Sequence, residues 1–148
     1  MRSSFLFIAR ALFSLTFFIS GGHALFNWSD TVTNFNKALD QWHIYSESFV
    51  YMNDILLYCI SYAQLLIGIA ICLEIMGGLC ILLNYHIRLG SLFLLLIFLL
   101  ETIVYHPFWL EIGENVYVQA TLFFKHLSII GALLYFLIKP RDIKDDVL

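Results

Sequence analysis

Four charged side chains interrupt the long apolar stretches of this sequence, and they are Arg10, Glu74, Glu101 and Lys125. A charge inside an apolar membrane span costs roughly 3 kcal/mol or more, so each side chain must face protein or a polar cavity and find a partner. Such residues commonly serve proton relays, ligand sites or helix pairing. Two acids and two bases therefore predict two buried ion pairs.

The expected depths of the charges indicate how they pair. At about 1.5 Å of rise per residue, Arg10 and Glu74 lie roughly 9 and 13 Å from the same end of their expected helices. Glu101 and Lys125 lie roughly 6 and 9 Å from the opposite end. We therefore expect an inner pair of Arg10 with Glu74 and an outer pair of Glu101 with Lys125.

Histidines and tryptophans gather near the outer pair, at the level where interfacial aromatic residues are common. Histidine exchanges protons near neutral pH, and a protonated lysine can donate hydrogen bonds to a quinone carbonyl or an anionic headgroup. The functional interpretation is an outward-opening polar pocket for a quinone headgroup or a proton relay; the alternative is structural ion pairs with ordinary interfacial histidines. The expected lining residues are His23, Glu101, His106, Trp109, Lys125 and His126.

A metal site is a weaker alternative, because these histidines lack the i,i+4 spacing or paired cysteines of typical ligand sets, and we predict none. Lys125 and His126 point about 100° apart on a helix, so only one of them is expected to face the interior. We also expect the packing face of that helix to carry Lys125, Ser128, Ala132 and Tyr135.

Composition places the chain among integral membrane proteins. Hydrophobic residues make up 61% of the 148 residues and charged residues 13%, with a mean hydropathy of +0.84. Soluble domains average about 25% charged residues. The net charge of −3 gives no general attraction to nucleic acid, so no nucleic-acid partner is expected. The sequence also lacks a Walker A loop, a dinucleotide fingerprint and a G-x-S-x-G motif.

Four apolar stretches are long enough to cross a hydrocarbon core of about 30 Å. They predict an all-α, membrane-spanning four-helix bundle that forms one domain over residues 1–148. The expected helices are about 4–26, 55–83, 89–105 and 119–138.

The first stretch resembles a signal peptide, but Arg10 interrupts the apolar core that such a segment needs. We expect a retained helix with Arg10, Ser14, Phe17 and Gly21 on its interior face.

Small residues surround Glu74 at helical spacing. Ala70 lies four residues before it, and Gly77 and Gly78 lie three and four residues after it, on the same helix face. Small side chains let another helix approach closely. Glu74 is therefore expected at a close crossing of two helices.

Residues 27–54 are too polar to span. Their apolar positions, Phe35, Leu39, Trp42 and Phe49, predict either an amphipathic helix lying in the membrane interface or a loop packed across the end of the bundle.

Several short motifs together resemble the DoxX family of small four-helix membrane proteins. They are Arg10-Ala-Leu-Phe-Ser-Leu-Thr-Phe-Phe-Ile-Ser-Gly21, Glu74-Ile-Met-Gly-Gly-Leu followed by Arg88, His106-Pro-Phe-Trp109 and Phe124-Lys-His-Leu-Ser-Ile-Ile-Gly131. Two positions depart from the family pattern. Members often close the first helix with lysine or a similar polar residue, where this chain has His23-Ala24, and they often have asparagine where this chain has His126.

The resemblance implies a multi-pass protein of the bacterial inner (plasma) membrane. Some relatives resemble small subunits of quinone-linked thiosulfate-oxidising or terminal oxidase assemblies, and others resemble membrane anchors for oxidative-stress proteins. We expect a redox-associated accessory subunit, rather than an enzyme by itself, that binds quinone or relays protons beside a membrane or cytoplasmic redox partner. No covalently bound cofactor is expected. The alternatives are a non-catalytic anchor or assembly factor and a small transporter, and homo-oligomers in the lipid bilayer fit each of these.

Loop charges predict the orientation. Arg2, Arg88, Lys139, Arg141 and Lys144 fall on one side of a four-span arrangement and only Lys37 on the other. Because short cytoplasmic loops carry the excess of Lys and Arg, both termini are expected in the cytoplasm.

Reporter fusions or cysteine labelling at Lys37 and Lys144 will place these residues on opposite sides, and placement on one side would refute the topology.

Overall fold

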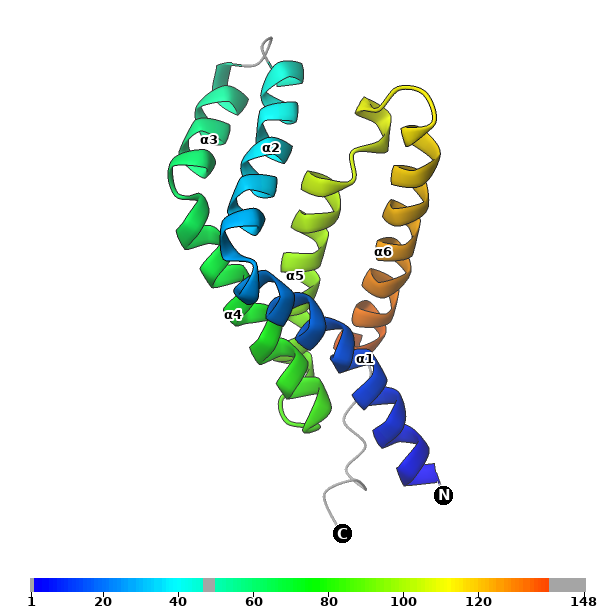
Figure 1. The fold of residues 1–148 in the computed structure, drawn as a ribbon. Coiled ribbons are helices and arrows are strands. Elements are labelled where there is room, and N and C mark those ends of the chain that lie inside the picture. Colours follow the sequence, from blue (N-terminus) through cyan, green and yellow to red (C-terminus); the bar gives the residue numbers. More distant parts are fainter. Residues whose placement is uncertain (1, 47–49, 139–148) are drawn as a thin grey trace.

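The computed structural model describes residues 2–46 and 50–138, and within them the chain is all-helical, as predicted (Figure 1). The elements are α1 (Arg2–Phe26), α2 (Trp28–Ser46), α3 (Val50–Ser61), α4 (Ala63–Leu82), α5 (Ile87–Tyr105), the short 3-10 helix η1 (Phe108–Leu110) and α6 (Asn115–Ile138). Four of them, α1, α4, α5 and α6, are long and apolar enough to cross a membrane. The predicted four-span architecture is therefore confirmed.

The spans pack in the order α1, α4, α5, α6, with α4 between α1 and α5. The start of α1 and the end of α6 lie at the same end of the bundle, as four crossings require (Figure 1). Which side of the membrane this end faces stays a prediction. The third helix ends at Tyr105, just before His106-Pro107, because proline disfavours continuation of a helix.

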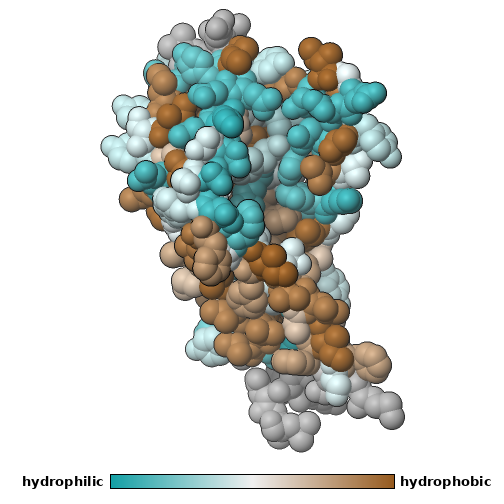
Figure 2. Space-filling view, viewed as in Figure 1, coloured by the Kyte–Doolittle hydropathy of each residue, from teal (hydrophilic) through white to brown (hydrophobic). Residues whose placement is uncertain are grey.

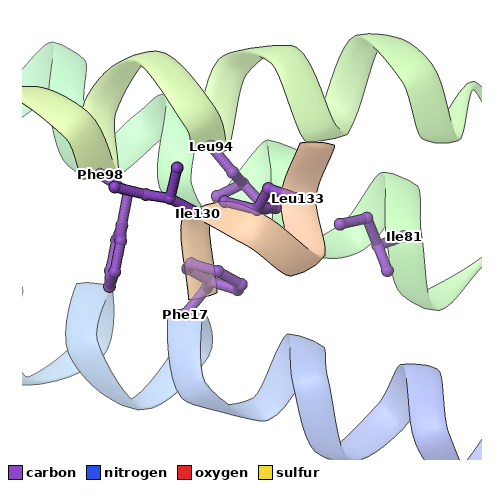
Figure 3. Close-up of a cluster of buried hydrophobic side chains, with 6 residues drawn as sticks. All are labelled: Phe17, Ile81, Leu94, Phe98, Ile130 and Leu133. Carbon is purple, nitrogen blue, oxygen red and sulfur yellow. The ribbon is translucent and has the colours of Figure 1, made fainter. Parts of the chain in front are cut away.

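The core is a cluster of buried apolar side chains to which all four spans contribute (Figure 3). Its members are Phe17, Ile81, Leu94, Phe98, Ile130 and Leu133. The Phe17 and Phe98 rings meet edge to face with their centroids 5.8 Å apart. Ser14, Phe17 and Gly21 are buried and Arg10 is half-buried, which confirms the predicted interior face of α1.

Helices α4 and α5 cross at backbone contact through two glycines. A methyl group added at Gly77 would lie 2.9 Å from the Gly90 carbonyl oxygen and 2.6 Å from Leu94 Cγ. One added at Gly90 would lie 2.5 Å from Cys80 Cβ and 2.9 Å from the Gly77 carbonyl oxygen. These contacts fix the register of the two helices and bear out the expected close crossing beside Glu74.

The prediction for the polar segment 27–54 needs correction, because it forms α2 and the start of α3. The two helices make a hairpin that extends beyond the spans (Figure 1). Leu39 of α2 is buried, and α2 packs against α3, α4 and α5. Its apolar side therefore meets protein instead of lying flat in the membrane interface. Phe49 falls outside the described residues.

The predicted helix 55–83 is also two helices, α3 and α4, which meet at Tyr62. Tyr62 has φ −108° and ψ 18°, outside helical values, yet Tyr62 N donates to the Tyr58 carbonyl and Leu66 N to the Tyr62 carbonyl, each at 3.0 Å. The apolar pattern runs through this joint, so periodicity alone could not reveal it.

A matching joint lies at Asn27, between α1 and α2. The main-chain hydrogen bonds from Asn27 N to the His23 carbonyl (3.0 Å) and from Thr31 N to the Asn27 carbonyl (2.9 Å) continue across it. Asn27 Nδ2 and Thr31 Oγ1 donate to the same two carbonyls. These polar side chains give the His23 and Asn27 carbonyl groups a second hydrogen bond where the chain leaves the apolar span.

The hairpin is fastened to the end of α5. Trp42 Nε1 donates to the Val104 carbonyl at 3.3 Å, and the Tyr45 hydroxyl donates to the Leu110 carbonyl at 2.9 Å. The Trp42 and Trp109 rings lie 6.1 Å apart. These contacts attach α2, and with it the α2–α3 hairpin, to the end of α5 and to η1.

The glycine contacts give a direct test of the fold. We expect Gly90→Ala to destabilise the protein by about 1–3 kcal/mol, because the added methyl overlaps α4. Gly22→Ala is the matched control, since nothing lies within 4 Å of a methyl at Gly22. This change should be neutral or stabilising by up to about 1 kcal/mol. Denaturant unfolding in detergent will measure both, and equal stability of the two variants would contradict the crossing.

Candidate functional site

Glu74 is the most buried charged side chain of the described spans. It is 3% exposed, and its Oε1 has no hydrogen-bond partner in the described structure. The Ser20 hydroxyl of α1 interacts with the carboxyl group. A methyl at Gly21 would lie 3.5 Å from Glu74 Oε2. Small residues of α1 therefore leave room for the acid but bring no cation to it.

The predicted pair of Arg10 with Glu74 is wrong. Helices α1 and α4 run antiparallel, because Gly21 packs against Ile75 while Phe17 packs against Gly78. Arg10 lies eleven residues before Gly21, or roughly 16 Å further along α1. That distance exceeds the reach of an arginine side chain. Counting depth from the helix ends missed the register that the glycine contacts impose.

Glu101 does not form the predicted outer pair with Lys125, and it interacts electrostatically with Glu74. The glycine contacts place Glu101 roughly 9 Å further along the bundle than Glu74. Tyr105, one turn along α5, also interacts electrostatically with Glu101. Neither acid forms a salt bridge with any residue of the described ranges. The site is therefore a pair of intramembrane acids without a cation.

His126 of α6 faces α5 within this region. Its Nδ1 lies 3.2 Å from Thr102 Oγ1, and its ring lies 4.6 Å from that of Phe98. Thr102 donates its only hydroxyl proton to the Phe98 carbonyl at 2.6 Å. The bond to histidine must therefore run from Nδ1–H to the hydroxyl oxygen, which leaves Nε2 free to accept a proton.

His106 is held in the same way. Its Nδ1 lies 2.8 Å from Gln119 Oε1, so the ring donates from Nδ1 and keeps Nε2 as an acceptor. The His106 and His126 rings stand nearly perpendicular, with centroids 4.7 Å apart. We call Glu101, His106 and His126 the acid–histidine cluster, because Glu101 directly precedes the Thr102 that contacts His126. Glu74 lies roughly 9 Å from Glu101 along the bundle and interacts with it electrostatically.

Two predicted pocket residues do not join the cluster. Lys125 is exposed on the outer side of α6, since its neighbour His126 takes the interior position. His23 is exposed near the end of α1. The predicted packing face of α6 is accordingly wrong, because Ser128 and Tyr135 are exposed with Lys125. The buried side of this helix carries Ile130 and Leu133.

Sequence reasoning missed three polar residues that support the cluster. Gln119 lies seven residues before His126 on the same helix face, and Tyr105 lies four residues after Glu101. Thr102 is indistinguishable from an ordinary span residue until its contact with His126 is seen. The helical spacing of Gln119 from His126 and of Tyr105 from Glu101 could have identified these two residues from the sequence.

Aromatic residues border the cluster at the end that carries α2 and η1. Trp109 contacts Phe108, Phe123 and Trp42. Figure 2 shows hydrophilic residues gathered over this end and a largely hydrophobic surface over the other. Trp109 therefore packs among aromatic residues at the polar end of the spans, and its part in a pocket stays a prediction.

The donor set favours proton exchange over metal binding. In the described part of the chain, no group of three or more His, Cys, Asp or Glu side chains is placed to hold a metal ion. The acids can bind or release protons, and the two free Nε2 atoms can accept them. Once protonated, the carboxyl groups and the Nε2 atoms can donate hydrogen bonds to the carbonyl oxygens of a polar ring.

The separation of Arg10 from Glu74 can be measured. In a double-mutant cycle of Arg10→Met and Glu74→Gln, we expect additive effects on the free energy of unfolding, within about 0.5 kcal/mol, because distant sites do not couple. Unfolding of the four proteins in one detergent will test this. A coupling energy well above that value would restore the ion pair.

Comparison with known proteins agrees with the architecture. The family model described as DoxX matches residues 5–107, which is most of the chain and includes α1 to α5. Comparisons with curated proteins and with solved structures gave no match. Together with four membrane-capable helices, the match indicates a multi-pass membrane protein in contact with the lipid bilayer. This chain belongs to the DoxX family.

Proposed function

We propose that this protein is an accessory membrane subunit of a redox system, in which the acid–histidine cluster binds a quinone headgroup and exchanges its protons beside a partner enzyme. One observation carries the proposal. Glu74 and Glu101 interact electrostatically inside the spans without a cation among the described residues, and two histidines with free Nε2 atoms meet near the level of Glu101.

The energetic argument starts from the cost of the acids. An uncompensated carboxylate inside a membrane span costs roughly 3 kcal/mol or more, so it must take up a proton or meet a ligand. Two interacting acids inside the spans that only stabilised the fold would gain more from a basic partner. The arrangement is therefore better suited to proton exchange than to helix pairing.

Quinone chemistry fits this donor set. Conversion of a quinone to a quinol adds two electrons and two protons, and the protons go to the two carbonyl oxygens. The chain supplies proton donors at Glu74 and Glu101 and acceptors at His106 and His126, while the partner enzyme supplies or removes the electrons.

The surroundings fit a flat, apolar ring with a hydrocarbon tail. Phe98 lies against His126, and Phe17 lies against Phe98, so aromatic faces border the polar groups. No backbone contact joins α1 to α6 in the described ranges, and aromatic side chains such as Phe13 and Phe136 bridge them. A hydrocarbon tail could lie against these aromatic side chains while the headgroup meets the cluster.

Quinone binding by purified protein tests the proposal. We expect a short-chain quinone analogue to quench tryptophan fluorescence in a saturable way. His126→Gln should weaken binding about tenfold or more, equivalent to about 1.4 kcal/mol, because the variant loses an imidazole that, once protonated at Nε2, donates to a quinone carbonyl. His23→Gln is the matched control, since His23 is exposed outside the cluster, and it should bind quinone like the unmodified protein.

Other results would redirect the assignment. Equal quinone affinity for the two histidine variants would remove the cluster from the binding site. A protein that binds no quinone but forms a stable complex with a redox enzyme would be an anchor or assembly factor. Substrate flux in liposomes without quinone binding would identify a transporter.

A further inference from the structure

Lys125 is a charged residue in an unfavourable place. It lies ten residues into α6, on the exposed side of that helix, and forms no ion pair with any residue in the described ranges. In a single copy this side of the span would face hydrocarbon. An ammonium group there costs roughly 3 kcal/mol unless it is covered or paired.

The missing partner lies at nearly the same depth on α5. The contact of 3.2 Å between Thr102 Oγ1 and His126 Nδ1 sets the register of α5 and α6. Glu101 and Lys125 each come one residue earlier on antiparallel helices, so their depths in the membrane differ by only about 3 Å. Each copy thus carries an unpaired cation on its outer surface and an unpaired acid, Glu101, in its interior at nearly the same depth.

The acids are reached from the side on which α1 and α6 are separated. Phe98 contacts Phe17 of α1 and His126 of α6, and Tyr105 contacts Phe35 of α2. The face of α5 that carries Phe98 and Tyr105 therefore looks into the seam between α1–α2 and α6. Glu101, between these two residues on the helix, is half-buried there.

The outer face of α6 can approach another helix closely. Ser128 and Gly131 lie on this face with Lys125, and nothing lies within 4 Å of a methyl added at Gly131. Small residues at such positions allow helices to pack tightly in membranes. A neighbouring chain can therefore be seated against Lys125 without steric conflict.

We propose that the neighbour is a second copy of this chain, and that Lys125 of one copy enters the α1–α6 seam of the next and pairs with Glu101. A two-fold axis through α6 would place Lys125 against its own copy, and like charges would repel. The copies therefore assemble head to tail, with Lys125 on one surface of each copy and the seam on another, and such an arrangement closes into a ring when the rotation between copies permits. The lysine completes the acid–histidine cluster, which deepens the proposed function, although the pairing itself does not require quinone.

Charge exchange between tagged copies tests the pairing. We expect the unmodified protein to form oligomers in lipid nanodiscs, and Lys125→Glu or Glu101→Lys alone to give monomers through like-charge repulsion. When the two variants are co-expressed with different tags, each of their interfaces joins opposite charges. Mixed oligomers should therefore form and be recovered through both tags in sequence, with sizes measured by light scattering.

Controls separate assembly from folding. Circular dichroism of the monomeric variants should show unchanged helix content, and Gly131→Leu, which leaves every charge in place, should also block assembly by filling the contact face. Monomeric unmodified protein, or failure of the charge-exchanged variants to assemble, would overturn the inference. Quinone binding by such a monomer would leave the proposed function standing, whereas oligomers that bind no quinone would retain this inference alone.

Discussion

The close approach of α4 to its two neighbours is the constraint on which the rest of the structure depends. Gly77 and Gly90 bring the backbones of α4 and α5 into contact, and Gly78 receives Phe17 and Phe18 of α1. Such contacts admit only one register, because a shift along either helix would drive a side chain into a backbone. Every interior polar group takes its depth from this register.

The distribution of charge follows from it. The register of α1 on α4 places Ser20 and Gly21 at Glu74 and leaves Arg10 far along the helix. The register of α5 on α4 brings Glu101 within electrostatic range of Glu74. Acids therefore gather inside the bundle while the basic residues of the spans lie elsewhere. Histidines with fixed Nδ1 partners complete a site equipped to exchange protons.

Aromatic packing shapes access to that site. The spans form a row from α1 to α6, and large side chains such as Phe17 and Phe98 close the space between the first and last members. Toward the other end α1 gives way to α2, which packs on α5 and is tied to it by Trp42. The cluster consequently lies between the apolar core and the polar end of the bundle. It borders the gap between α1–α2 and α6.

The sequence by itself determined the four spans, the interior face of α1 and the glycine-rich crossing beside Glu74, since length, periodicity and small residues act locally. It also identified Glu101, His106, His126 and Trp109 as residues near one end. Only the tertiary structure decided that α2 is a helix packed on protein, that the apolar run from residue 55 to residue 83 breaks at Tyr62, and that Arg10 and Lys125 leave the acids unpaired. These outcomes depend on interhelical register and on a rotation of about 100° between neighbouring residues, which no single helix encodes.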